Sequence, residues 1–286
     1  MTTSRLLERI GLDPAAPPPA TSDGLRTVHR AFVSRVPYEA LSVQLGTCGP
    51  LDADALTARV LAGRGGYCFE VNTVLAALLR ALGFTLALHQ AVVGGEGPTN
   101  HMALVVDLGD EHGRFIADAG LGEGALDPLP LAPGTYGPPP FTWTVHPQGA
   151  DGSWQIASHP HCSFAGLRME GEPSPLDAFA PHHERLSTTP DSSFVQTLVV
   201  QRPSDDALTT LRARTLSTAT TGGTTKRILA DDGDLRRTLH TTFGIPPRAL
   251  TDVDVARLWR QAAEQHEAYV ARRSVGGPTA PARTGA

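Results

Sequence analysis

The segment Arg64-Gly65-Gly66-Tyr67-Cys68-Phe69-Glu70 runs directly into an apolar stretch, residues 71–82, and it decides which fold and chemistry we expect. Because two glycines let the backbone turn tightly, Cys68 is predicted to open a helix, with its sulfur near unpaired backbone N–H groups and the positive end of the helix dipole. That setting favours the thiolate, the nucleophilic form of cysteine. Most free cysteines only pack, yet a packing cysteine needs neither the glycines nor the adjacent Arg64. We therefore expect Cys68 to be a nucleophile.

The first part of the chain is predicted to be helical. Apolar residues recur there at three- and four-residue spacing, and the first three runs each begin near a Ser, Thr or Asp that can cap a first turn. The last of these runs is apolar almost all round, so it is predicted to be a central buried helix that ends at Gly83. Helices are expected over residues 3–10, 22–35, 52–61 and 68–82.

From residue 85 the pattern changes to short β-type runs divided by Gly, Pro, Asn and Asp clusters, which favours an antiparallel sheet or a small barrel. Strands are expected over residues 85–93, 101–108, 114–119, 141–145 and 154–157. The last part of the chain mixes both patterns. It is predicted to hold a strand pair over 194–201 and 208–214, a Thr/Gly-rich loop over 217–225, a strand over 226–229, and helices over 234–243 and 251–272.

Composition limits the classes of function. A chain of 286 residues can bury a large core, and we expect two or three packed subdomains. The net charge of −5, with no dense Lys/Arg block, gives no electrostatic footprint for nucleic acid or a membrane surface, so a small-molecule partner is expected. Three cysteines without CxxC spacing predict a reducing compartment and no zinc site. Because the chain also lacks a signal-peptide pattern and a long apolar run, we expect a cytoplasmic protein.

A thiol nucleophile needs a base and a third group to hold that base, and one pair of residues is suitably spaced. His101 opens one predicted strand and Asp118 closes the next. If the strands form a hairpin centred near Gly109 and Asp110, residues whose numbers sum to about 219 face each other, as His101 and Asp118 do. A slip of one residue would turn the two side chains to opposite faces. The arithmetic therefore predicts a base and its partner near Cys68.

Three further features carry weaker predictions. Gly120 and Gly122 follow Asp118 and would let a ligand phosphate approach the backbone, although a dinucleotide fingerprint is absent. Glu39 and Arg64 are either a buried ion pair that braces the turn before Cys68 or two unrelated surface charges. The cluster at residues 159–162, His-Pro-His-Cys, is predicted not to hold a metal, because the proline prevents regular ligand spacing.

In combination these segments resemble the arylamine N-acetyltransferase family. The most specific match is residues 64–70, continued by Asn72 and residues 75–84. Further matches follow in family order at residues 7–11, 36–39, 101–102, 118–120, 187–194 and 243–245, so the resemblance covers about residues 5–250. It implies an α+β fold with a cysteine-protease-like core. The implied units are an N-terminal helical bundle with the nucleophilic cysteine (1–85), a central antiparallel β-barrel with the histidine and aspartate (86–200), a C-terminal α/β lid (201–275) and a tail (276–286).

The resemblance also implies a reaction and a set of site residues. The family's mechanism is ping-pong: a cysteine takes an acetyl or other acyl group from CoA and passes it to an arylamine or hydrazine nitrogen. Here the implied catalytic triad is Cys68, His101 and Asp118, with no metal. The implied supporting residues are Gly120 and Gly122 beside the acyl-CoA co-substrate, Tyr38, Phe69 and Leu121 in the substrate pocket, and Glu39 and Arg64 as a structural pair.

Departures from the family pattern leave the substrate open. The family's usual Pro-Phe-Glu-Asn is here Pro37-Tyr38-Glu39-Ala40, and Leu121 occupies a position that is often Phe in bacterial members. One alternative is an amide synthase of the same family, which takes its acyl chain from a carrier protein and closes a macrolactam in natural-product biosynthesis. A second is a thiol hydrolase or transglutaminase-like enzyme with the same triad. A silent binding protein is disfavoured because all three triad residue types are present.

Overall fold

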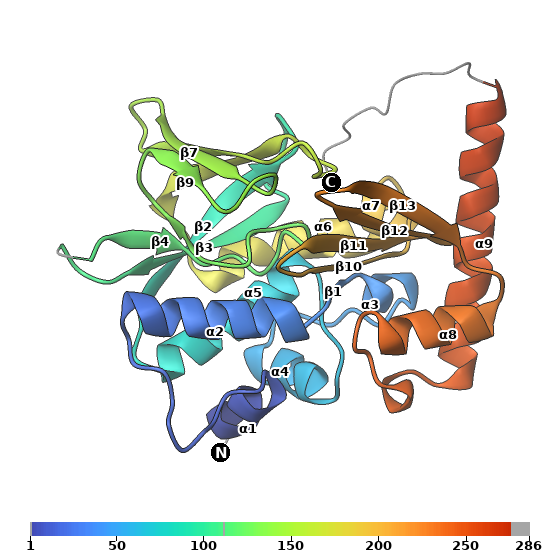
Figure 1. Ribbon diagram of the computed structural model, residues 1–286, viewed down its shortest axis with the longest axis horizontal. Helices are drawn as coiled ribbons and strands as arrows, with labels where there is room; N and C mark the ends of the chain where they lie inside the picture. Colours follow the sequence, from blue (N-terminus) through green and yellow to red (C-terminus); the bar gives the residue numbers. More distant parts are fainter. Residues whose placement is uncertain (1, 111, 276–286) are drawn as a thin grey trace.

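The computed structural model describes residues 2–110 and 112–275. It shows an α+β fold in which N-terminal helices lie below an eight-stranded antiparallel sheet, while a five-stranded sheet and two C-terminal helices lie to one side (Figure 1). The expected tail, residues 276–286, falls outside the described residues. Within the described part of the chain, no helix combines the length and the apolar character needed to cross a membrane.

The N-terminal helices form where the apolar periodicity predicts them. The side chains of Thr21 and Asp52 each accept a hydrogen bond from a backbone N–H in the first turn that follows, as expected for helix caps. The last long helix is buried along nearly all its length and ends before Gly83, which adopts a left-handed conformation with φ of +89°. The helices of this part are α1 (Thr2–Arg9), α2 (Ser22–Arg35), α3 (Leu41–Gln44), α4 (Ala53–Leu61) and α5 (Cys68–Ala81).

The eight-stranded sheet curls into a near-closed barrel, with the strand order β5-β4-β3-β2-β9-β8-β7-β6 (Figure 1). Every neighbouring pair for which a register is assigned runs antiparallel, as the sequence predicted. The strands are β2 (Thr85–Val93), β3 (His101–Asp107), β4 (Arg114–Ile116), β5 (Leu129–Pro130), β6 (Gly134–Tyr136), β7 (Trp143–Gln148), β8 (Ser153–Ala157) and β9 (Gly166–Pro173).

The predicted register of the β3–β4 hairpin is wrong by two residues. Val105 pairs with Ile116 and Asp107 with Arg114, so facing residues have numbers that sum to 221. The turn is centred one residue later than expected, and the ladder ends at Ile116, before Asp118. A shift of two residues, unlike a shift of one, leaves every side chain on its original face of the sheet. The inference that His101 lies on the same side as Asp118 therefore survives the error.

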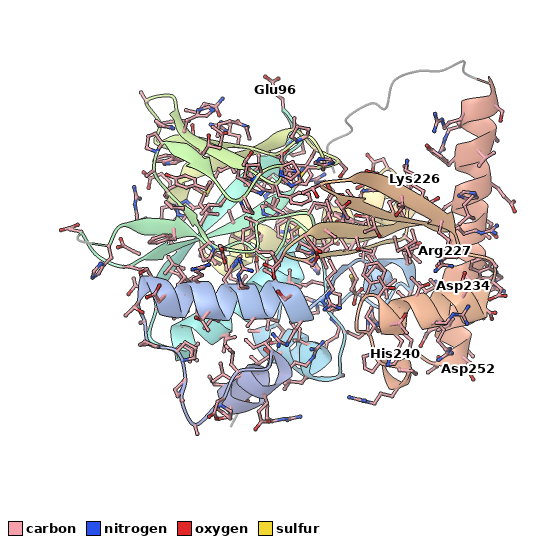
Figure 2. All side chains as sticks on the ribbon, viewed as in Figure 1. Glu96, Lys226, Arg227, Asp234, His240 and Asp252 are labelled. Atoms are coloured by element: carbon pink, nitrogen blue, oxygen red, sulfur yellow. The ribbon has the colours of Figure 1, made fainter. Side chains whose placement is uncertain are left out.

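The five-stranded sheet has the order β1-β10-β11-β12-β13. It pairs β1, from the N-terminal part of the chain, with strands that follow the barrel in sequence. A short 3-10 helix, η1 (Leu176–Phe179), and helices α6 (Ala180–Thr188) and α7 (Ser193–Gln196) lead into it. Its strands are β1 (Tyr38–Glu39), β10 (Val199–Pro203), β11 (Ala207–Arg212), β12 (Thr215–Thr220) and β13 (Gly223–Ile228). The last elements are α8 (Asp232–Thr241), the 3-10 helix η2 (Pro247–Ala249) and α9 (Asp252–Val275). Arg227 on β13 binds Asp234 on α8 at 2.6 Å and so ties the sheet to the helices (Figure 2).

Two local predictions in this region are wrong. Residues 194–196, expected to begin a strand, belong to α7, because the Ser192 side chain accepts a hydrogen bond from the N–H of Phe194 and caps a helical turn. Residues 217–225, expected to be a loop, belong to the β12–β13 hairpin, in which Thr218 pairs with Thr225. Threonine is β-branched and favours strands, so the Thr/Gly content indicated a hairpin more than a loop.

Buried apolar side chains form three clusters. The first surrounds α5, the second fills the eight-stranded barrel, and the third lies between the five-stranded sheet, α8 and α9. Phe179, Leu186 and Phe194 pack in the first cluster although they follow the barrel in sequence. The unit boundaries at residues 85, 200 and 275 stay predictions. What the clusters show is that α5 is the element around which the N-terminal core is built.

Gly65 offers a direct test of the packing before α5. A Cβ at Gly65 would lie 1.7 Å from the carbonyl oxygen of Pro37, whereas a Cβ at Gly49 meets nothing within 4 Å. We expect Gly65→Ala to lower the free energy of unfolding by about 2 kcal/mol or more through overpacking. The control Gly49→Ala is expected to stay within about 0.5 kcal/mol of the wild type. Urea unfolding of both variants measures this, and equal midpoints would contradict the assigned role of Gly65.

Candidate active site

The turn that places Cys68 is shaped by close backbone approach. Gly65 lies against Pro37, and the carbonyl of Gly66 accepts a hydrogen bond from the N–H of Glu39 at 3.0 Å. Neither glycine is among those with a positive φ, so the requirement for glycine here is space rather than a left-handed backbone. Helix α5 then begins at Cys68, as predicted.

The Glu39–Arg64 ion pair is present and buried. Arg64 Nε and Nη2 donate to the two carboxylate oxygens of Glu39 at 2.8 and 3.1 Å, and the side chains are 9% and 1% exposed, respectively. The backbone N–H groups of Leu41 and Gly65 also donate to this carboxylate, at 2.7 and 3.2 Å. Burial raises the pKa of the Glu39 carboxyl, but Arg64, Arg59 and the N–H of Leu41 together lower it below its ordinary value. The pair therefore holds β1 against the turn that precedes Cys68.

Cys68 is 2% exposed, and its thiol donates a hydrogen bond to the carbonyl of Asn100 at 3.5 Å. Burial raises the pKa of this thiol well above its usual range, and the charge of Asp118 adds to the increase. The N–H groups of Phe69 and of Cys68 itself lower the pKa by less. The expectation that the helix start alone favours the thiolate is therefore wrong. Formation of the thiolate requires a base that takes the proton.

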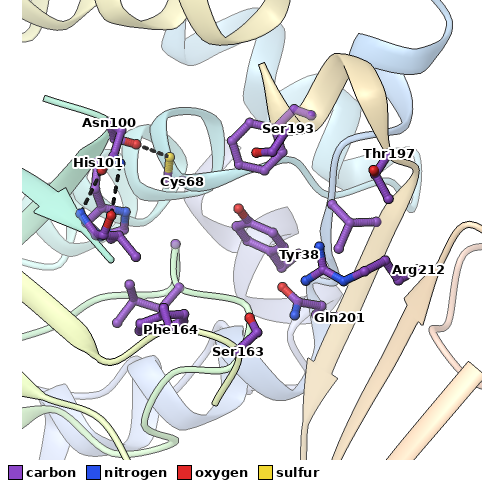
Figure 3. Close-up of a pocket in the computed structure, with 15 residues that line it drawn as sticks. Tyr38, Cys68, Asn100, His101, Ser163, Phe164, Ser193, Thr197, Gln201 and Arg212 are labelled. Carbon is purple, nitrogen blue, oxygen red and sulfur yellow. Dashed lines mark hydrogen bonds between the residues drawn. The ribbon is translucent and has the colours of Figure 1, made fainter. Parts of the chain in front are cut away.

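An imidazole from β3 lines the same cavity as Cys68. His101 Nε2 lies 2.6 Å from Asp118 Oδ2, and both side chains are buried. Because an ionised carboxylate only accepts hydrogen bonds, Nε2 donates to Asp118, and Nδ1 is the ring nitrogen that this carboxylate does not engage. His101 and Cys68 line one cavity (Figure 3). The arrangement of thiol, imidazole and carboxylate is that of a nucleophile with an oriented base.

Asn72 holds Asp118 in place. Its side-chain amide donates to Asp118 Oδ1 at 2.7 Å and to the carbonyl of Met102 at 2.6 Å, and it accepts from the N–H of Ala119 at 3.0 Å. The N–H of Gly120 donates to the same Asp118 oxygen at 2.8 Å. Burial raises the pKa of Asp118, but His101, Asn72 and Gly120 together lower it below its ordinary value. Asp118 is thereby kept as an anion beside the imidazole.

The cavity at Cys68 is narrow, about 40 Å³, which is room for a few water molecules. Of the residues that the sequence singles out, five line it: Tyr38, Cys68, His101, Gly120 and Leu121. Gly120 approaches Cys68 so closely that a Cβ would lie 2.7 Å from Cys68 Cα. The cavity lies where α5, the barrel and the five-stranded sheet meet (Figure 3).

Two predicted site residues lie elsewhere. Phe69 is fully buried in the first apolar cluster, edge-on to Tyr67 and close to Phe179, and it is not among the residues that line the cavity. Gly122 has φ of +66° and lies against the far side of Tyr38, where a Cβ would come within 2.2 Å of Gln201 Oε1. The structure thus gives Gly122 a packing role next to the site and does not bring Phe69 to the cavity.

Several residues of the site had no predicted role. Asn72, which binds Asp118 but does not line the cavity, lies one helical turn after Cys68, and this spacing of four residues was the available signal, since residues four apart share a helix face. Val93 and Asn100 line the cavity from β2 and from the residue before β3, and the other lining residues come from 163–212, far from Cys68 in the chain, where no local pattern links them to it. They include Ser163, Phe164, Ser193, Phe194, Thr197, Gln201 and Arg212.

A second, larger cavity of about 310 Å³ lies between α2, residues 123–130 and the β10–β11 turn. Phe141, Trp143 and His159 form part of its wall, and the triad residues do not. His159 Nε2 lies 3.3 Å from the sulfur of Cys162. Over the described ranges, no three His, Cys, Asp or Glu side chains are grouped so that they could hold a metal ion. Of these two cavities, only the narrower one is lined by Cys68 and His101.

Comparison with known proteins places this geometry in a family. A family model described as N-acetyltransferase matches residues 21–249. The chain belongs to the arylamine N-acetyltransferase family. An arylamine N-acetyltransferase of Mycolicibacterium smegmatis is 29% identical over 269 residues, which cover 87% of this chain and 94% of that protein. The protein is thus an arylamine N-acetyltransferase-type enzyme.

Solved structures agree in fold. The arylamine N-acetyltransferase from Mycobacterium abscessus superposes with a TM-score of 0.82 at 26% identity, covering 92% of this chain and 95% of that one. The structure of the Mycobacterium marinum enzyme in complex with CoA superposes with a TM-score of 0.81 at 24% identity, covering 92% and 98%. The predicted fold of helical bundle, barrel and C-terminal sheet with helices is confirmed.

The ionised state of Asp118 predicts a pH dependence of stability. Because its pKa in the folded protein lies below the unfolded value of about 3.9, its charge stabilises the folded state at higher pH. The contribution is complete above about pH 5 and is lost as the pH falls below about 4 toward the folded pKa. We expect the difference in free energy of unfolding between wild type and Asp118→Asn to be constant from pH 8 to about 5 and to shrink below about 4.

Asn72→Ala provides the matched comparison, because it removes a hydrogen bond to the ionised carboxylate while Asp118 remains. In this variant the pKa of Asp118 is expected to rise, so the acid-induced loss should begin at higher pH than in the wild type. Chemical unfolding at a series of pH values gives both results. If the difference in free energy of unfolding between wild type and Asp118→Asn grew as the pH falls, the assignment of Asp118 as an anion in the folded protein would be contradicted.

Proposed function

We propose that the protein moves an acetyl or other acyl group from a CoA thioester to the nitrogen of an aromatic amine or hydrazine, through a thioester on Cys68. One observation carries the proposal: a buried cysteine shares a narrow cavity with an imidazole whose other nitrogen is held by a buried carboxylate. Membership of the arylamine N-acetyltransferase family supports the same chemistry. Catalytic roles are thus proposed for Cys68, His101 and Asp118.

In the first half-reaction His101 Nδ1 takes the proton of the Cys68 thiol, and the sulfur attacks the carbonyl carbon of the donor thioester. The developing oxyanion would be stabilised by backbone N–H groups at the start of α5. The carbon–sulfur bond of the donor then breaks, and its thiolate takes the proton back from His101 and leaves as CoA. Asp118 stabilises the imidazolium that exists between the two transfers.

In the second half-reaction the amine attacks the thioester on Cys68. His101 accepts a proton from the attacking nitrogen, the bond between the acyl carbon and the Cys68 sulfur breaks, and the returning proton restores the thiol. Because the cavity is small, one substrate at a time can reach Cys68, and this agrees with a ping-pong order. The burial that raises the pKa of the thiol also makes the thiolate a reactive species, since little water solvates it.

CoA as donor is supported by the family and by the related Mycobacterium marinum enzyme, whose solved structure is a complex with CoA. We propose that the donor thioester reaches Cys68 along Gly120, where the missing side chain leaves the backbone open to the cavity. Tyr38 and Leu121 are proposed to contact the acceptor. Gly122 is proposed to assist by packing behind Tyr38.

Mass spectrometry of the intact protein tests the thioester directly. After incubation with acetyl-CoA we expect one acetyl group on the wild type and none on Cys68→Ala. His101→Ala should acquire it far more slowly, because it lacks the base, with a loss of about 100-fold or more. Cys48→Ala and Cys162→Ala are the controls and should be labelled like the wild type, because neither cysteine lines this cavity. Unaltered labelling of Cys68→Ala would overturn the mechanism.

The same adduct separates the competing functions. A labelled protein that loses its acetyl group only when an aromatic amine is added supports the acetyltransferase. Equally fast loss in water would identify a thiol hydrolase instead. Labelling by acyl carrier protein thioesters but not by acetyl-CoA would identify the amide synthase, with the same nucleophile and a different donor.

A further inference from the structure

Arg212 is a cation without a counter-charge at the Cys68 cavity. It ends β11 and pairs with Val199 of β10, so the two side chains lie on one face of the sheet, and both line the cavity. Its guanidinium lies beside Tyr38 and Gln201 (Figure 3). Among the described residues it makes no hydrogen bond and no ion pair. By contrast, the half-buried Arg59 and the buried Arg64 each bind a glutamate.

Unused hydroxyl groups lie in the same place. Ser193, which opens α7, and Thr197, which follows it, line the same cavity as Arg212 (Figure 3). Neither side-chain hydroxyl has a hydrogen-bond partner within the described part of the chain, and both residues are half-buried. A guanidinium and two hydroxyl groups that line one cavity offer several donors and one positive charge to whatever enters it.

The nearby carboxylates are already engaged. Glu123 accepts from Gln201 Nε2 at 2.6 Å and from the N–H of Ser163 at 2.5 Å, so it lies behind Gln201 with both oxygens in use. Asp118 is bound by His101, as described above. The positive charge of Arg212 lowers the pKa of the Tyr38 hydroxyl, although burial raises that pKa by more. Arg212, an exposed residue that also lines the cavity, therefore has no carboxylate partner among the described residues.

We propose that Arg212, with the hydroxyl groups of Ser193 and Thr197, binds an anionic oxygen group of a substrate whose reacting atom lies at Cys68. This proposal rests on the proposed function, and it adds the substrate class: a carboxylate on the amine acceptor or a phosphate of the acyl donor. Arginine suits both groups, because its planar fork donates two parallel hydrogen bonds to a carboxylate or a phosphate. Arg212 is then a specificity-determining residue that holds the substrate and takes no part in proton transfer.

The experiment compares charged and neutral substrates. The acceptor pair, 4-aminobenzoate and 4-aminobenzamide, has nearly equal shape, and the donor pair sets acetyl-CoA, which carries phosphates, against the small neutral ester p-nitrophenyl acetate. For each pair the ratio of kcat/KM for the charged over the neutral member is measured in the wild type, Arg212→Ala, Arg212→Lys and the control Arg257→Ala. Arg257 is an exposed arginine on α9 that does not line the cavity, so its loss changes net charge equally.

We expect Arg212→Ala to lower one of these ratios by about tenfold or more, the loss typical of a charged hydrogen-bonded contact. Arg212→Lys should recover part of the loss, and Arg257→Ala should leave both ratios at the wild-type value. A fall in the acceptor ratio identifies a carboxylate on the amine, and a fall in the donor ratio identifies a phosphate of the donor. Unchanged ratios in Arg212→Ala, or equal falls in Arg257→Ala, would overturn the proposal.

Direct binding separates this proposal from the proposed function. If the wild type forms no acyl adduct with any donor, the acyltransfer mechanism fails, but the anion site is still measurable by calorimetric titration with benzoate and with inorganic pyrophosphate. Tighter binding of either anion to the wild type than to Arg212→Ala, by about tenfold, supports the site. Equal binding to both proteins, or none to either, overturns it.

Discussion

The buried ion pair between Glu39 and Arg64 is the interaction on which the site depends. Two buried charges are costly to remove from water, and the cost is met only when their hydrogen bonds are complete. Here the Glu39 carboxylate receives four: two from Arg64 and two from backbone N–H groups. Glu39 belongs to β1, which pairs with β10 of the five-stranded sheet, and Arg64 precedes the turn into α5. This ion pair thus fixes the turn before α5, and with it Cys68, relative to the five-stranded sheet and the third apolar cluster.

The catalytic arrangement depends on a second polar network in the same low-dielectric setting. Asp118 is anionic because His101, Asn72 and Gly120 all hydrogen-bond to it, and its charge orients the imidazole. The same burial raises the pKa of Cys68. A resting thiol that is activated only by a correctly oriented base avoids a permanently exposed thiolate, which is the form that oxidants and stray electrophiles attack. Burial therefore disfavours the thiolate of Cys68 and makes its formation depend on a neighbouring base.

Much of the local structure was predictable because its causes lie within a few residues. Capping residues and helical periodicity predicted α2 and α5 almost to the residue, and the β-type run predicted β2 over the same residues as observed. Errors arose where two signals competed. Ser192 caps a helical turn where apolar residues indicated a strand, and the β3–β4 turn is centred one residue later than its glycine suggested. Because the register differs from the predicted one by an even number of residues, His101 and Asp118 were still predicted to lie on the same face of the sheet.

The sequence by itself predicted that Cys68 opens α5 and that His101 lies beside Asp118, because a glycine turn before a helix and two strands joined by a short turn are local patterns with local physical causes. It also determined the family. The tertiary structure alone decided that burial raises the pKa of the Cys68 thiol, that Phe69 packs in the core, and that Arg212 lines the cavity. Burial and unpaired charge are properties of the surroundings, and these surroundings are assembled from segments more than a hundred residues apart. No local sequence pattern predicts which of those segments will contact one another.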